Sequence, residues 1–412
     1  MSAIRPLLVP AVLLLAACNR EQPAVDPQLA AEIAGIKAID NHAHPVLTAP
    51  GDREFDALPV DHMEPQSDPV AMRPGAFTTP FTAQSKAAAK RERGDGYPAW
   101  VLDQMGIETM LANRVAMGTS VQPPRFRWVP YADALIFPLD NSLLAAKNPD
   151  RKAFFPLEDK LRARYLAESG LGAPPATLAD YLARVVTPTL ERHKRDGAVA
   201  EKFEAAYLRS LAFDAADAAQ ADRVYRQRTP SDADYKVLQD YLFRYIAGEC
   251  GRLGMAVHLH TMAGAGGYFD VGGAKPLNLE GVLNDPALRK TKFVMVHGGW
   301  PFTREITALL EKPNAYLDFS GQSLWLSPTT LSGILREWLE HVPEKVMFAT
   351  DGYPYSDEMG WEESAWIAAH NGREALGRAL TAMLRDGTIT HARAAELARM
   401  VLRENARALY GF

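Results

Sequence analysis

Cysteine is scarce in this sequence, and long apolar runs and blocks of one charge are missing. Its 412 residues include only two cysteines, Cys18 and Cys250. The apolar stretch at residues 7–17 is too short to span a bilayer as a helix. Lys/Arg-rich runs do not occur and the net charge is only −5, so nothing indicates nucleic-acid binding. No internal repeat or low-complexity tract is evident, and the 47% hydrophobic content is ample for a buried core.

The beginning of the chain carries a targeting pattern that does not belong to the fold. Arg5 supplies a minimal positive region, residues 7–17 supply the apolar one, and the tetrapeptide LAAC that ends at Cys18 resembles the bacterial lipobox. In a lipobox, small residues admit the peptidase, and the cysteine takes the diacylglyceryl group before it becomes the new N-terminus. The alternative is an ordinary signal peptide with an incidental cysteine.

This pattern predicts a lipoprotein signal peptide at residues 1–18, a tether at 19–30 and a catalytic domain at 31–412. Asn19, which follows the modified cysteine, favours the outer membrane with the protein facing the periplasm. Acylation of Cys18 leaves Cys250 without an internal disulfide partner, and we expect Cys250 to be packed inside a helix. The protein is therefore expected to be exported and anchored to the cell envelope by lipid.

Short apolar strands, each followed by polar residues, alternate with longer helical stretches along the chain. The predicted strands lie at residues 36–43, 109–116, 134–139, 198–205, 256–260, 292–297, 315–319 and 345–350. Eight such β/α units predict an α/β fold, a (β/α)₈ TIM barrel. Two segments interrupt the plan: a long Pro/Gly-rich loop insertion after the first strand, at 45–105, and a helical insertion before the fourth, at 140–195.

Histidines and an aspartate stand at the predicted strand ends. His42 and His44 close the first strand, and residues i and i+2 of a strand share a face, so both imidazoles can bind one metal ion. His260, His297 and Asp351 end strands five, six and eight. A chance pair among ten histidines would not explain this placement, because barrel active sites form at the C-terminal strand ends.

The segments around these residues resemble the amidohydrolase superfamily, in its amidohydrolase-related (amidohydrolase-2) branch, over residues 31–412. The similar segments are IDNHAHP at 39–45, LHT at 259–261, VHGGWPF at 296–302, FATD at 348–351 and ENARALY at 404–410.

The resemblance implies His42, His44, His260 and Asp351 as ligands of a divalent metal. It also implies that Asp351 accepts a proton, and that His297 hydrogen-bonds the metal-bound water or the substrate. A divalent metal lowers the pKa of bound water from ~15.7 to about 7, so hydroxide forms near neutral pH. Imidazole and carboxylate ligands suit Zn²⁺, although Mn²⁺, Fe²⁺ or Co²⁺ fit such a site too.

Three further residues are candidates for substrate binding. Lys202 and Arg209 lie on or just after the fourth strand, where a Lys of this branch either binds substrate or is carboxylated and bridges two metals. We favour substrate binding, and thus one metal per chain, with two as the alternative. His258 shares a face with His260 and is a candidate for substrate binding, for an outer contact or for ligation. Trp300 and Tyr353 either line the pocket or pack. The remaining histidines are expected to be solvated or structural: His62, His193, His341, His370 and His391.

These residues favour hydrolysis of an amide, ester or lactone in a small-molecule substrate. The alternative function is a non-oxidative decarboxylase of the same branch, in which the same metal and Asp351 would serve protonation and C–C cleavage. A surface-anchored binding protein without activity has no need of a complete ligand set, and a structural lipoprotein would be a short chain without one. Sequence sets no expectation for the oligomeric state.

Overall fold

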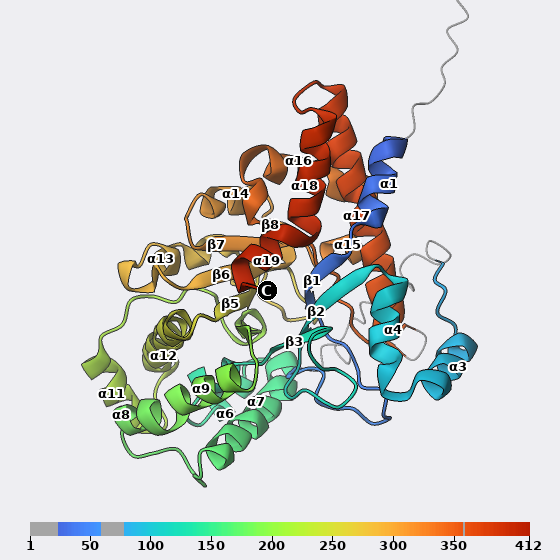
Figure 1. The fold of residues 1–412 in the computed structure, drawn as a ribbon. Helices are drawn as coiled ribbons and strands as arrows, with labels where there is room; N and C mark the ends of the chain where they lie inside the picture. The colour runs from blue at the N-terminus through green and yellow to red at the C-terminus, as the bar shows by residue number, and fades with distance from the viewer. Residues whose placement is uncertain (1–23, 59–77, 357–358) are drawn as a thin grey trace, which may run out of the picture.

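The computed structural model describes residues 24–58, 78–356 and 359–412 (Figure 1). Cys18, the predicted lipobox and His62 lie outside these ranges. Within them lie eight strands, separated by helices except between β2 and β3: β1 (Ala38–Ala43), β2 (Ile107–Asn113), β3 (Phe126–Val129), β4 (Ala200–Phe203), β5 (Ala256–His260), β6 (Lys292–Val296), β7 (Ala315–Asp318) and β8 (Val346–Met347).

The strands pair in parallel in the orders β1-β2-β3 and β4-β5-β6-β7-β8. Parallel bridges from Trp128 to Ala198 and from Tyr131 to Lys202 join the two groups. The ring closes where the amide of Asn41 donates to the carbonyl of Phe348 at 3.0 Å. It is therefore a closed barrel.

A side-chain contact reinforces the closure between the first and last strands. The hydroxyl of Thr350 donates to Asp40 Oδ2 at 2.5 Å, and its amide donates to Asp40 Oδ1 at 2.9 Å. Both residues are fully buried, so a carboxylate of β1 holds the turn that follows β8.

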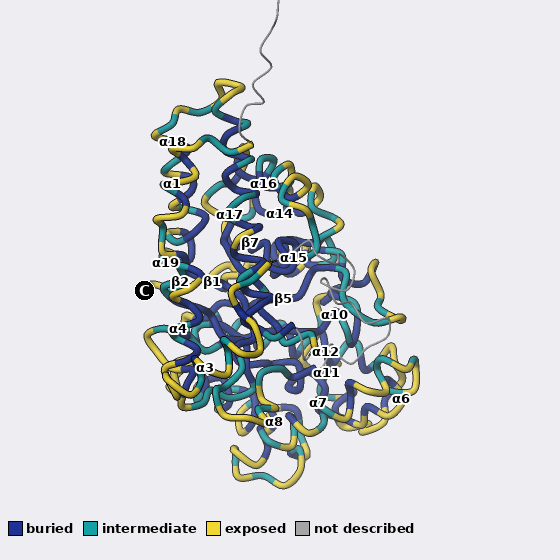
Figure 2. Tube along the Cα trace, turned by 90° about the vertical axis from the view of Figure 1, so that its right-hand side faces the viewer, coloured by how far each residue is buried: buried dark blue, intermediate teal, exposed yellow. Residues whose placement is uncertain are grey.

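Small and branched apolar residues fill the barrel, and larger ones face the helices outside. The interior cluster consists of Ile39, Leu111, Val129, Ala200, Ala256, Val294, Val296, Met347 and Ala406. Ala406 belongs to the last helix, α19, which packs against β1 and β8. In Figure 2 the strands are buried, and the exposed residues gather on outer helices and loops.

The helices cover the outside of the ring. They are α1 (Pro27–Gly35), α3 (Ala83–Arg93), α4 (Tyr97–Gln104), α5 (Asp133–Ile136), α6 (Ser142–Ala145), α7 (Pro149–Glu168), α8 (Leu178–Tyr181), α9 (Thr187–Arg195), α10 (Ala205–Leu208), α11 (Ala218–Gln227), α12 (Asp232–Leu253), α13 (Glu280–Leu283), α14 (Glu305–Leu310), α15 (Gln322–Trp325), α16 (Pro328–His341), α17 (Trp361–Arg385), α18 (His391–Arg399) and α19 (Asn405–Tyr410). None of these helices is long and apolar enough to cross a membrane.

The predicted third strand is wrong. Residues 134–139 contain most of helix α5, and β3 lies earlier, at Phe126–Val129. The apolar run from Ala134 is buried on every side, and periodicity does not distinguish a buried helix from a buried strand in so short a run. The other predicted strands overlap the observed ones, and Cys250 is packed inside α12 as expected.

Two predicted segment boundaries also need correction. The tether was expected to reach residue 30, yet α1 begins at Pro27 behind an Asp26 cap, and Leu29 is fully buried. The expected loop at 45–105 contains α3 and α4 in its final part. An Ala-rich stretch and the capping box between Thr82 and Ser85 start α3.

Candidate metal centre

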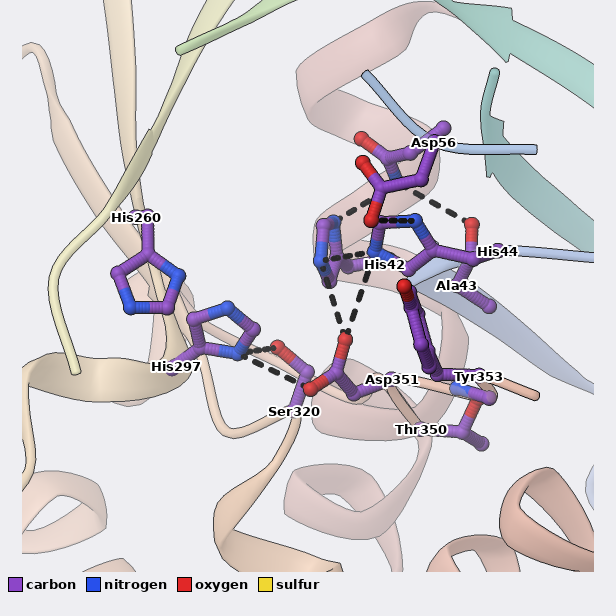
Figure 3. Close-up of polar contacts among 12 residues, drawn as sticks. His42, Ala43, His44, Asp56, His260, His297, Ser320, Thr350, Asp351 and Tyr353 are labelled. Atoms are coloured by element: carbon purple, nitrogen blue, oxygen red, sulfur yellow. Dashed lines mark hydrogen bonds and ion pairs between the residues drawn. The ribbon is translucent and has the colours of Figure 1, made fainter. Parts of the chain in front are cut away.

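Two imidazoles and a carboxylate converge at the C-terminal end of the barrel (Figure 3). His42 Nε2 and His44 Nε2 lie 3.3 Å apart. Asp351 Oδ1 is 3.3 Å from the first of these nitrogens and 3.7 Å from the second. Both imidazoles are buried. Among the described residues this is the one group whose ligand atoms all lie within 4.8 Å of one another.

The hydrogen bonds around the imidazoles fit a bound cation. His44 Nδ1 lies 3.3 Å from the carbonyl oxygen of Phe55, which can only accept, so Nδ1 carries the proton. The lone pair of His44 is then on Nε2, which faces His42 and Asp351. Asn113 Nδ2 lies 2.8 Å from His42 Nδ1, and Asn113 Oδ1 has no hydrogen-bond partner among the described residues. A metal on His42 Nε2 needs the proton of this ring on Nδ1, so the Asn113 amide must turn its oxygen toward that nitrogen when the ion binds. The donor set therefore fits a divalent ion.

Burial shifts the pKa values of the two imidazoles and the carboxylate. It lowers the pKa of His44 to about 3 and that of His42 well below its usual range, so both imidazoles are in the neutral, ligating form. Burial raises the pKa of Asp351 to about 7. A bound cation favours the ionised carboxylate, because the ion is the largest local charge.

His260 does not join this group. Its Nε2 lies 2.9 Å from the carbonyl oxygen of Met262, and its Nδ1 lies 3.6 Å from Glu204 Oε2. The structure therefore brings three of the four predicted ligands together, and the assignment of His260 as a ligand stays a prediction. Three protein ligands leave a coordination position open, as catalytic zinc sites do.

His297 lies beside the centre, as its predicted role requires. Its Nδ1 is 3.8 Å from Asp351 Oδ2, and its ring centroid is 5.0 Å from that of His42. His297 and Asp351 both have positive φ, at 70° and 60°. Non-glycine residues in the left-handed region are strained, and such strain concentrates at functional sites.

Lys202 reaches the centre, but it is already paired. Its Nζ lies 3.5 Å from His42 Nε2 and 2.8 Å from Glu204 Oε1, and the side chain is fully buried. Sequence analysis did not single out Glu204, which follows directly after β4 and caps α10. Asn113, on β2, and Tyr131, whose hydroxyl is 3.1 Å from His44 Nδ1, gave no sequence signal.

Two residues predicted to bind substrate lie elsewhere. Arg209 donates to Asp240 Oδ1 at 2.6 Å and stacks on Phe213, so its charge is used within the fold. His258 Nε2 lies 2.6 Å from the Tyr410 hydroxyl. Because His258 precedes His260 by two residues on β5, it sits one layer deeper in the barrel.

Of the other aromatic and histidine residues considered in the sequence, some lie beside the centre and others lie away from it. Tyr353 packs its ring 5.1 Å from the His44 ring and borders the centre. His193 is buried rather than solvated, with Nδ1 2.9 Å from Glu201. The described remainder lie outside the centre: His341 and His370 on helices α16 and α17, and His391 at the start of α18.

Solved structures share this fold across nearly the whole chain. A Lactobacillus casei protein named as a metal-dependent hydrolase superposes with a TM-score of 0.62 at 16% identity, covering 93% of this chain and 97% of its own. Uronate isomerase from Thermotoga maritima gives 0.60 at 14% identity, covering 94% and 98%. Glucuronate isomerase from Caulobacter crescentus gives 0.59 at 12%, covering 95% and 96%. At such identities the likeness shows the fold alone.

Sequence relatives place the chain more narrowly. Protein fluG of Emericella nidulans is 32% identical over 120 residues, which cover 29% of this chain and 13% of fluG. The pattern of the amidohydrolase family matches residues 176–412, from α8 to the C-terminus, and so includes the strand ends that carry His260, His297 and Asp351. With more than half of its length matched, this chain belongs to the Amidohydro_2 family of the amidohydrolase superfamily.

Proposed function

We propose that this protein is a hydrolase that uses one divalent metal, Zn²⁺, to cleave an amide, ester or lactone bond. The observation that carries the proposal is the convergence of His42, His44 and Asp351 at the C-terminal mouth of the barrel. These three residues would hold the ion, and the open coordination position of such a site would admit water. When bound, the ion supplies a hydroxide near neutral pH and polarises the scissile carbonyl.

The two oxygens of Asp351 face different partners. Oδ1 points to the two imidazoles, and Oδ2 lies 3.8 Å from His297 Nδ1. One oxygen can therefore ligate while the other takes a proton from the attacking water and returns it to the leaving group. His297 is placed to orient the water or the substrate carbonyl.

Charge pairing favours hydrolysis over decarboxylation. A decarboxylase must anchor a substrate carboxylate, which calls for an available cation. Lys202 is paired with Glu204 at 2.8 Å and Arg209 with Asp240 at 2.6 Å, so neither predicted cation is available. Aromatic rings border the centre instead, with Tyr353 beside His44 and Tyr207 4.7 Å from His260. A neutral substrate with an apolar part fits these surroundings.

Elemental analysis and an activity screen test the proposal. The purified protein should hold near one equivalent of metal, and a double His42→Ala, His44→Ala variant should lose it. His260→Ala is the matched comparison and should keep the metal, because His260 stands outside the three-ligand group. The metallated protein should turn over members of ester, lactone or amide panels. Turnover confined to carboxylic acids, with release of CO₂, would establish the decarboxylase instead.

We also propose that the protein is exported and anchored by lipid at Cys18, on the periplasmic face of the outer membrane. The support is the LAAC sequence ahead of Asn19. A short polar segment then links the lipid to the barrel.

A further inference from the structure

The segment from Asp318, the last residue of β7, to Gln322 contacts His297 through three side chains. Asp318 Oδ1 accepts the backbone N–H of His297 at 3.1 Å. Ser320 Oγ lies 2.8 Å from the imidazole Nδ1, a contact drawn in Figure 3. Gln322 Nε2 donates to the backbone carbonyl of His297 at 2.8 Å. These three residues of the segment are fully buried.

These contacts explain how a strained residue stays in place. His297 has φ 70° and is followed by Gly298 and Gly299, which also have positive φ. A left-handed non-glycine residue costs of order 1–3 kcal/mol and persists only where its surroundings over-determine it. Asp318 and Gln322 hold both backbone polar groups of His297, which meets that condition.

The carboxylate of Asp318 determines where the protons of Ser320 and His297 lie. Asp318 Oδ1 accepts the Ser320 hydroxyl at 2.5 Å, so the single proton of Ser320 is already given away. Ser320 Oγ must then accept from the ring, which places the proton of His297 on Nδ1. In the neutral ring the lone pair of His297 is then on Nε2.

The acceptor is fixed from its other side as well. Asn41 Nδ2 donates to Asp318 Oδ2 at 2.7 Å, and Asn41 Oδ1 accepts the Tyr410 hydroxyl at 2.5 Å. The backbone N–H groups of His297 and Ser320 also donate to Asp318 Oδ1, at 3.1 and 3.0 Å, and an N–H can only donate, so this oxygen is an acceptor.

We propose that Asp318, Ser320 and Gln322 form a positioning clamp that holds His297 as the neutral tautomer protonated on Nδ1. His297 then takes part in the reaction through Nε2 as a hydrogen-bond acceptor, toward the attacking water or a substrate hydroxyl. The assignment of the tautomer is independent of the proposed hydrolysis, and only the role of Nε2 in the reaction rests on it.

Substitution of Ser320 tests the clamp, and Ser323, three residues later in α15, supplies the control. Ser323 is equally buried, and its Oγ has no hydrogen-bond partner among the described residues. The full chain, labelled with ¹⁵N-histidine, is compared as wild type, Ser320→Ala, Ser320→Thr and Ser323→Ala. Long-range ¹H–¹⁵N spectra report the protonated ring nitrogen, and His297→Asn identifies the His297 signals.

Wild type and Ser323→Ala should show His297 protonated on Nδ1 alone. Ser320→Ala should show both tautomers, and Ser320→Thr should restore the single one. With a substrate in hand, kcat of Ser320→Ala should fall about tenfold, which is close to the loss of one hydrogen bond, with KM nearly constant. A wild-type signal protonated on Nε2, or an unchanged tautomer in Ser320→Ala, would overturn the clamp. The spectra decide this even if no hydrolysis is found.

Discussion

At the scale of single residues, the two roles proposed for Asp351, metal ligand and base, are separable by substitution. Asp351→Asn keeps the size and one coordinating oxygen but removes the basic carboxylate. Metal affinity should weaken moderately, whereas kcat should fall by roughly 10²–10⁴-fold, as for loss of general acid–base catalysis. The measurement is steady-state kinetics at matched metal occupancy. A fully metallated Asp351→Asn protein that turns over at the wild-type rate would exclude Asp351 as the base.

The pH dependence of metal binding also belongs to single residues. In the metal-free protein His44 has a pKa of about 3, so it is neutral throughout the physiological range, whereas Asp351 has a pKa of about 7. Asp351 must lose its proton to ligate, so the apparent affinity for Zn²⁺ should rise as pH increases toward about 7 and level off above it. Competition with a chelator between about pH 5 and about pH 8 measures this, and Asp351→Asn should flatten the curve.

Spacing and strand position identified the ligands but not the residues that support them. His42 and His44 were predictable because alternate residues of a strand share a face, and Asp351 because barrel strands end at the active site. Asp318 and Ser320 act only through a histidine on the neighbouring strand, which folding brings to them. In this structure the His260 side chain contacts the Met262 carbonyl of its own loop, a detail that a motif does not encode.

At the scale of elements, helix α19 closes the end of the barrel opposite the metal centre. The Tyr410 hydroxyl donates to Asn41 Oδ1 at 2.5 Å and meets His258 Nε2 at 2.6 Å. Tyr410→Phe leaves both of these fully buried partners unsatisfied and should lower the free energy of unfolding by about 1–3 kcal/mol. Denaturant titration of the metal-free protein measures the loss.

Tyr316→Phe is the matched control for Tyr410→Phe. Tyr316 packs against the same interior cluster, and its hydroxyl meets Lys292 Nζ at 3.3 Å, outside the Asn41 network. Tyr316→Phe should lower the free energy of unfolding by no more than about 0.5 kcal/mol, as surface substitutions do. Equal losses in the two variants would mean that the Asn41 network contributes nothing specific.

Sequence patterns predicted elements best where polar and apolar residues alternate. Strand β5 was predicted to the residue, since His258 and His260 alternate with the apolar Val257 and Leu259. Helix α5 was mistaken for a strand because Ala134 and its neighbours are apolar and buried on all sides. Tertiary packing determines the secondary structure of such a segment, so the local sequence pattern could not predict it.

At the scale of the whole molecule, the proposed lipid anchor predicts that the protein is found in the membrane fraction. Cys18→Ala should remain unprocessed or lose its acyl group, and it should leave the membrane fraction. Metabolic labelling with a fatty acid, followed by fractionation, measures this. Cys250→Ala is the control, since Cys250 is buried within α12 and should not be labelled. An unmodified N-terminus at another position in the wild-type mature protein would contradict the proposal.

The contact between Asp40 and Thr350 has a consequence for how the protein is made. These residues lie 310 positions apart in the sequence, yet their contact closes the ring and sets the turn that carries Asp351. A chain still on the ribosome displays His42 and His44 long before their carboxylate partner has been synthesised. Capture of the ion must therefore wait for an almost complete chain. If the chain is exported before it folds, the metals of the receiving compartment, rather than those of the cytoplasm, select the cofactor.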